Sequence, residues 1–132
     1  LRAHDSEYHF LCSKILEFEA AGSDHSPTLL LMPNAMRRVL EIFLAFKEPG
    51  THPIKQKLSN LIKRHPKIDA TRMVALERLS QVESHSDNLD DLIGHSPMIV
   101  EEVRSTCSAL LHLMEIADEP HTTAIRRQCR VN

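Results

Sequence analysis

Apolar residues recur at intervals of three and four along most of this chain, a spacing that places them on one side of an α-helix. The first such segment predicts a helix over residues 5–21, with Asp5 or Ser6 as its cap. The run "TLLLMP" is then expected to be extended, and Pro33 suits the first turn of the next helix. That helix ends at "KEPG" and has the widest apolar face: Met36, Val39, Leu40, Phe43 and Phe46.

Three further helices are predicted after Gly50. The segment "PIKQKLSNLIKRH" carries apolar residues on one side and lysines on the other. Asp69 is placed to cap a helix over residues 69–85, whose buried stripe would be Met73, Leu76, Leu79 and Val82. Residues 86–96 are expected to form a loop. A long amphipathic helix is predicted over residues 97–118, with the apolar series Val100, Val103, Cys107, Leu110, Leu111 and Met114.

The fold class predicted from these segments is all-α. No segment alternates apolar and polar residues over the length of a strand, and the short connections favour an antiparallel bundle of about five helices. We expect one domain over residues 1–118. The basic tail, residues 119–132, is either a short helix or disordered.

Composition narrows the class of protein. With 132 residues, 42% of them hydrophobic, the chain can bury the core of one domain, and its net charge of −2 supplies no general positive field for nucleic acid. Three widely separated cysteines suggest a reducing, cytoplasmic setting. No apolar run approaches the roughly 20 residues needed to cross a membrane. Because the first residue is leucine, the sequence is expected to be a piece of a longer chain.

Candidate chemistry lies on the helix predicted over residues 69–85. Arg78 and His85 are seven positions apart, within about 20° of each other around the helix axis, with Gln81 beside them. An arginine can hold a phosphate and a histidine can transfer a proton, so the pair could cleave a phosphodiester without a metal. The alternative is a solvated helical face that ends in His85, next to the negative end of the helix dipole.

A second cluster, Arg37 and Arg38 with Glu41, is expected on the polar side of the helix after Pro33. Ordinary surface ion pairs explain this spacing. If that side instead faces Arg78, Glu41 would orient an arginine in a shared electropositive site. The sequence leaves both arrangements open.

Several kinds of site are not predicted. The chain contains neither H-E-x-x-H nor C-x-x-C, so no metal site is expected despite nine histidines. It also lacks the G-x-x-x-x-G-K-[ST] phosphate loop and the G-x-S-x-G turn of serine hydrolases. We therefore expect no cofactor and no ATP hydrolysis by this chain alone.

Three segments carry a resemblance: "SEYHFL" at 6–11, "LMPNAMRRVLEIFLAFKEPG" at 31–50 and "ESHSD" at 83–87. Together, over about residues 5–117, the chain resembles the carboxyl-terminal region of large bacterial ABC-like AAA ATPases, a group that includes the RloC and PrrC anticodon nucleases and related phage-defence ATPases. The resemblance implies that an ATPase portion precedes Leu1. It also implies kinship with HEPN domains, helical modules that often form dimers and cleave RNA without metal through an R-x(4–6)-H motif. "RLSQVESH" has that spacing, with Leu79 where many active motifs have a polar residue.

Two classes of function follow. The first is a metal-independent endoribonuclease that works as a homodimer on an RNA such as tRNA. In this enzyme His85 would act as acid or base on the ribose 2′-hydroxyl. Arg78 would stabilise the phosphorane, and Arg38 with Glu41 would orient the site. Alternatively, a non-catalytic helical module dimerises or docks effectors onto an ATPase portion or partner chain, supported by the long helix predicted over residues 97–118. A regulator that binds another protein is a third possibility.

Overall fold

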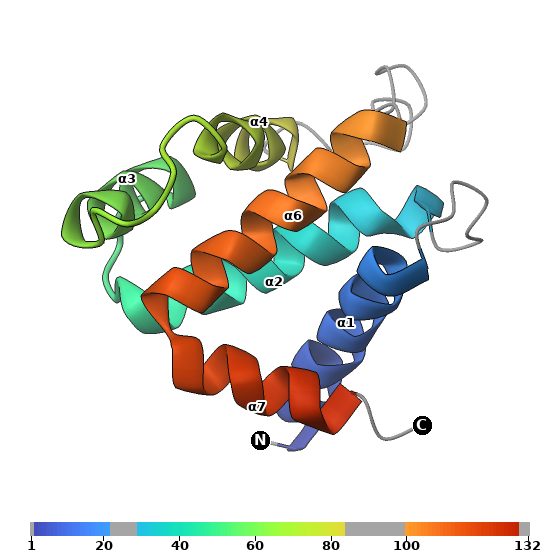
Figure 1. Ribbon diagram of the computed structural model, residues 1–132. Helices are drawn as coiled ribbons and strands as arrows, with labels where there is room; N and C mark the ends of the chain where they lie inside the picture. Colours follow the sequence, from blue (N-terminus) through green and yellow to red (C-terminus); the bar gives the residue numbers. More distant parts are fainter. Residues whose placement is uncertain (1, 22–28, 84–99, 130–132) are drawn as a thin grey trace.

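The chain is all-α in the part that the computed structural model describes, residues 2–21, 29–83 and 100–129 (Figure 1). These ranges contain no strand, which confirms the predicted fold class. The elements are α1 (Arg2–Ala21), a 3-10 turn η1 (Leu29–Leu31), α2 (Met32–Lys47), α3 (Ile54–Arg64), α4 (Met73–Glu83), α6 (Val100–Ala117) and α7 (Glu119–Cys129). The loop predicted over residues 86–96 lies outside the described residues.

Helices α2 and α6 form the centre of the bundle. They pack against each other, and Figure 1 shows α1 with α7 on one side of this pair and α3 with α4 towards the other. Helix α6 contacts α1, α2, α4 and α7, whereas α3 contacts α2 and α4. The two central helices therefore hold the outer helices in one body.

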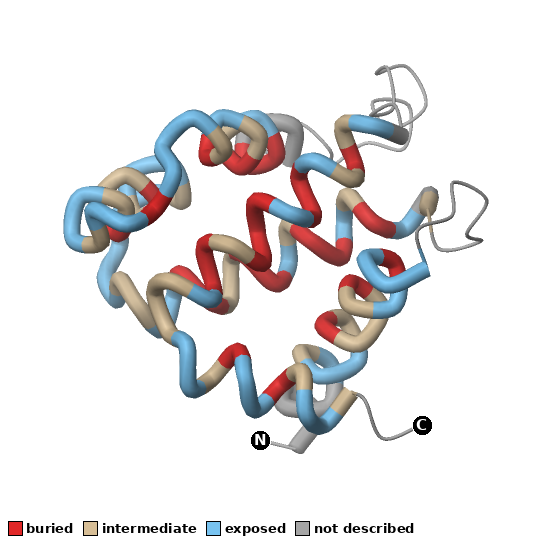
Figure 2. Tube along the Cα trace, viewed as in Figure 1, coloured by how far each residue is buried: buried red, intermediate tan, exposed pale blue. Residues whose placement is uncertain are grey.

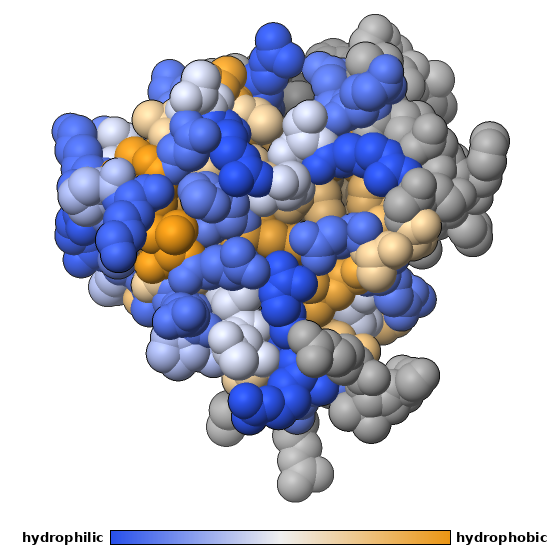
Figure 3. All heavy atoms as spheres, in the orientation of Figure 1, coloured by the Kyte–Doolittle hydropathy of each residue, from blue (hydrophilic) through white to orange (hydrophobic). Residues whose placement is uncertain are grey.

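The core lies along the facing sides of these helices (Figure 2). Hydrophilic residues predominate on the face that Figure 3 shows. On α6 the described members of the predicted apolar series are all buried: Val103, Cys107, Leu110, Leu111 and Met114. Because this face packs inside the bundle, the described part of this long amphipathic helix is a core helix.

The predicted apolar face of α2 is correct except at its carboxyl end. Met36, Val39, Leu40 and Phe43 are buried, but Phe46 is 80% exposed and Leu44 is buried instead. The prediction failed at Phe46 because helical spacing gives the side of a helix and not where its neighbours stop. Phe46 lies one residue before the end of α2, beyond the packed part of the core.

The start of α2 also differs from the prediction. Leu29–Leu31 form a 3-10 turn that continues into α2, where an extended run was expected. Pro33 sits in the first helical turn, where its missing N–H costs no hydrogen bond. This winding buries Met32 completely and leaves Leu31 63% exposed, so burial of Met32 outweighs the extended preference of a residue before proline.

Two predicted caps fall at different places. Helix α1 begins at Arg2, so Asp5 and Ser6 lie within it; the polar start of the chain has no apolar spacing that would mark a boundary. Asp69 initiates a turn ahead of α4, since its Oδ1 accepts hydrogen bonds from the N–H (3.0 Å) and Oγ1 (2.7 Å) of Thr71. Helix α4 itself begins at Met73.

Helix α7 occupies most of residues 119–132, the tail that was predicted to be either a short helix or disordered. Its Thr122 and Ile125 are buried, and it packs on α1 and α6. The Tyr8 hydroxyl lies 2.9 Å from Nε2 of His121. Arg126 bridges Glu19 of α1 (3.1 Å) and Glu115 of α6 (2.8 Å). Apolar and polar contacts together fix α7 to the bundle.

Candidate functional site

Arg78 lies on the exposed side of α4. Its side chain is 69% exposed, and its Nη1 lies 3.2 Å from Oε2 of Glu102 on α6. The next residue, Leu79, is 2% exposed and belongs to the core. The side chain of Gln81 and all of His85 lie outside the described residues, so the relation of His85 to Arg78 stays a prediction from helical spacing.

The seam between α4 and α6 continues from Arg78 towards the start of α4. Arg72 donates a hydrogen bond to the hydroxyl of Ser108, and Nε2 of His112 accepts one from the backbone N–H of Asp69 at 3.2 Å. Residues later in α6 thus contact residues that come earlier in α4 and in the turn before it. The two helices are antiparallel, joined by polar contacts along an exposed edge.

An open hollow of about 500 Å³ lies on this seam, lined by Thr71, Arg72, Ala75, Arg104, Ser105 and Ser108. The guanidinium of Arg104 lies over the ring of Phe18, 5.6 Å from its centroid. Neither Arg72 nor Arg104 belongs to a site that the sequence predicts. No short motif contains both, because the hollow forms only when α4 packs on α6.

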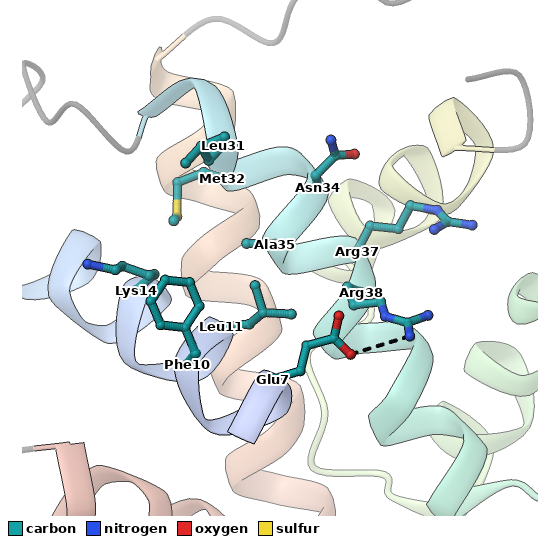
Figure 4. A pocket seen from close by; sticks show the side chains of 10 residues that line it. All are labelled: Glu7, Phe10, Leu11, Lys14, Leu31, Met32, Asn34, Ala35, Arg37 and Arg38. Carbon is teal, nitrogen blue, oxygen red and sulfur yellow. Dashed lines mark hydrogen bonds and ion pairs between the residues drawn. The ribbon is translucent and has the colours of Figure 1, made fainter. Parts of the chain in front are cut away.

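A second hollow, the α1–α2 groove, has a volume of about 380 Å³ (Figure 4). Its lining comes from α1 and from the η1–α2 segment: Glu7, Phe10, Leu11, Lys14, Leu31, Met32, Asn34, Ala35, Arg37 and Arg38. Phe10 is 58% exposed and Leu31 is 63% exposed. Two of the three segments that carry the sequence resemblance, residues 6–11 and 31–50, meet at this groove.

The predicted cluster of Arg37, Arg38 and Glu41 lies at one edge of the α1–α2 groove. Oε1 of Glu41 lies 3.1 Å from Nη1 of Arg38, and its Oε2 lies 3.4 Å from Nη2 of Arg37. Nη2 of Arg38 also lies 3.4 Å from Oε1 of Glu7 on α1 (Figure 4). Hydrogen bonding to Glu41 raises the pKa of Arg38, whereas burial lowers that of Arg37. Glu41 thus orients two arginines, one of which ties α2 to α1.

The buried titratable groups are poor candidates for chemistry. Burial raises the pKa of the Cys12 and Cys107 thiols to about 12, and it raises the pKa of Tyr8 above its usual value. Thiols with such high pKa values form little thiolate at neutral pH and are weak nucleophiles. Across the described ranges, no three His, Cys, Asp or Glu side chains are grouped so that they could hold a metal ion. None of the described helices is long and apolar enough to cross a bilayer.

Comparison with known proteins places this helical bundle in a family. Residues 1–112 match a family described as an AAA domain, and the match extends from α1 through most of α6. The chain therefore belongs to the AAA domain family. No curated protein and no solved structure matches it. The regular elements of the described residues are all helical, and the sequence contains no G-x-x-x-x-G-K-[ST] phosphate loop.

Proposed function

We propose that this chain is a non-catalytic, self-associating helical module of an AAA-family protein, in which two copies dock through the α1–α2 groove. The observation that supports this proposal is the pair of exposed apolar side chains, Phe10 and Leu31, at the lining of that groove. An exposed apolar patch next to a recess is typical of a contact surface, since removing apolar surface from water is favourable.

The α1–α2 groove has the two features that a two-fold interface needs. A surface that binds its own copy must be complementary to itself, because each copy presents the same patch; projections beside a recess provide this. Here Phe10 and Leu31 project beside a recess that is large enough to receive a side chain. Complete burial of a Phe or Leu side chain contributes about 1.5–3 kcal/mol, and a two-fold contact counts each side chain twice.

The charges at the rim of the groove also suit a second copy. Lys14 and Arg38 line the groove, as does Glu7, whose Oε1 lies 3.4 Å from Nη2 of Arg38. Both signs are therefore present around the apolar lining. A rim of one sign would repel its own copy, whereas a mixed rim can pair with itself after a two-fold rotation.

Sedimentation velocity over a range of protein concentrations tests this proposal. The wild-type protein is expected to sediment faster as its concentration rises, whereas Phe10→Asp and Leu31→Asp should remain monomeric. Phe46→Asp is the matched control, because Phe46 is an even more exposed phenylalanine outside the groove lining and its substitution should leave association unchanged. A wild-type protein that stays monomeric at every concentration, or a Phe46→Asp variant that fails to associate, contradicts the proposal.

A second candidate function is a metal-independent endoribonuclease of the HEPN type. The observation that favours it is the exposure of Arg78 on α4, with Leu79 turned into the core. An exposed guanidinium can contact a phosphodiester and stabilise negative charge on its phosphorane. In this proposal His85 transfers the proton of the ribose 2′-hydroxyl, and the products carry a 2′,3′-cyclic phosphate and a 5′-hydroxyl.

Incubation with a tRNA pool in EDTA separates this candidate from the first. Cleavage by the wild-type protein should be lost in Arg78→Ala and in His85→Ala, and retained in Arg127→Ala, which removes an exposed arginine from α7. Absence of cleavage by the wild-type protein, or equal cleavage by all variants, refutes the nuclease.

A further inference from the structure

The open hollow between α4 and α6 has no place in either proposed function. It is lined by Thr71, Arg72 and Ala75 on the α4 side and by Arg104, Ser105 and Ser108 on α6. Among the described residues that line it, two are cationic, three carry hydroxyl groups and none is acidic. We infer that this hollow binds a phosphate group, held by Arg72 and Arg104 with the hydroxyls of Ser105 and Ser108 beside them.

Arg72 differs in its contacts from Arg78 and Arg38. Arg78 and Arg38 lie against carboxylates, on Glu102 and Glu41. Arg72 instead donates to the neutral hydroxyl of Ser108, and it forms no ion pair with a carboxylate in the described ranges. A guanidinium has five N–H donors, so one bond to a serine leaves the group able to bind an oxyanion in a charge-assisted pair.

The position of Arg104 is set by the ring of Phe18, over which its guanidinium lies. A guanidinium that stacks through its flat face can still donate hydrogen bonds from its edge. The stem of Arg104 is partly buried, so less side-chain freedom is lost when a ligand binds. Phe18 thus acts as a platform that holds the charge at the hollow.

The start of α4 adds to the attraction for an anion. Thr71 and Arg72 directly precede Met73, the first residue of this 11-residue helix, and helix amino termini carry a partial positive charge. One carboxylate lies close by: Asp69 accepts two hydrogen bonds from Thr71, and these bonds, together with the charge of Arg72, lower the pKa of Asp69. Because Thr71 holds it, Asp69 competes less for Arg72. The hydroxyl of Ser108, an acceptor for Arg72, can donate its own hydrogen to the anion.

The same chemistry could come from a small phosphate compound or from the backbone of a single-stranded nucleic acid. Two probes distinguish them: inorganic pyrophosphate, followed by titration calorimetry, and a fluorescein-labelled single-stranded oligonucleotide, followed by anisotropy. Binding of pyrophosphate alone identifies a small ligand, whereas binding of the oligonucleotide alone identifies the backbone. Binding of both supports a general phosphate site. In each case binding should weaken as salt rises.

Two substitutions test the residues. Arg72→Gln removes one charge, and Ser108→Asp places a carboxylate in the hollow at an exposed position. Each should weaken binding about tenfold or more, as loss of a charge-assisted hydrogen bond does. Arg127→Gln removes an exposed charge on α7 and should bind like wild type. Circular dichroism and the urea midpoint confirm that each variant is folded.

The inference is independent of self-association and of RNA cleavage, so it can fail while either of those stands. It is overturned if neither probe binds the folded wild-type protein. It is equally overturned if Arg72→Gln and Ser108→Asp bind as tightly as wild type, or if Arg127→Gln weakens binding as much as they do.

Discussion

Helix α7 should be an integral part of the bundle, and Ile125→Ala measures how much it contributes. Ile125 is 5% exposed and packs in a tight apolar site with Cys12, Ile15, Leu16, Val39, Leu111 and Met114, which come from α1, α2 and α6. Truncation of a buried isoleucine to alanine removes transferred apolar surface and leaves a cavity, at a cost of about 2–5 kcal/mol. Since α7 is at the periphery and can adjust, we expect about 2–4 kcal/mol for Ile125→Ala.

Urea unfolding followed by circular dichroism gives the free energy of unfolding of Ile125→Ala and of the wild-type protein. A loss of about 3 kcal/mol should lower the melting temperature by roughly 10 °C for a chain of this size. Thr123→Ala serves as the control, because Thr123 is exposed on the same helix and should change stability by less than about 0.5 kcal/mol. If Ile125→Ala is as stable as the control, α7 does not contribute to the cooperative fold.

Three further outcomes follow from the titratable groups. Burial raises the pKa of Asp118, but its contacts with Lys47 Nζ, at 2.7 Å, and with the N–H of His121 prevail and hold it below its usual value. A carboxyl whose pKa is lowered in the folded state stabilises the fold at pH values above its unfolded pKa, and this stabilisation is lost as the pH falls through the folded pKa. Asp118→Asn should therefore cost about 1 kcal/mol at pH 7 and progressively less as the pH falls below the ordinary range of an aspartate; urea midpoints measured across this pH range check this. Cys12 and Cys107, both buried, should react with iodoacetamide far more slowly than the partly exposed Cys129, as mass spectrometry of timed samples would show, and equal rates would contradict their burial. Tyr8→Phe removes the hydrogen bond to His121 and should lower the free energy of unfolding by about 1 kcal/mol in the same urea assay, with no change counting against that bond.

The spacing of apolar residues correctly predicted the buried side of α2, because the position of a residue around the helix axis decides which side it lies on. Met36, Val39, Leu40 and Phe43 share one side of α2 and all lie in the core. Phe46 has the same spacing but is exposed, because the end of the packed core depends on neighbouring helices that the local pattern does not encode. The 3-10 turn at Leu29–Leu31 was missed for a similar reason, since burial of Met32 outweighs the local preference before Pro33.

The polar sites follow the same rule. The contacts of Glu41 with Arg37 and Arg38 lie within one helix, so their spacing was enough to predict them. The hollow at Arg72 and Arg104 joins segments about 30 positions apart, and the α1–α2 groove joins residues 7–14 to residues 31–38. Such sites arise only when helices pack together, and the periodicity of residues along a single helix does not predict that packing.

Self-association through the α1–α2 groove is tested most directly by contacts between two distinguishable copies. In a sample that mixes isotope-labelled and unlabelled protein, filtered nuclear Overhauser spectra report only contacts between copies. We predict cross-peaks from the methyl groups of Leu11 and Leu31, which line the groove and are not fully buried, on one copy to the ring of Phe10 on the other. Contacts between copies confined to α3, α4 or α7, or a sample without any such contacts at concentrations where the protein sediments as a dimer, would contradict docking through this groove.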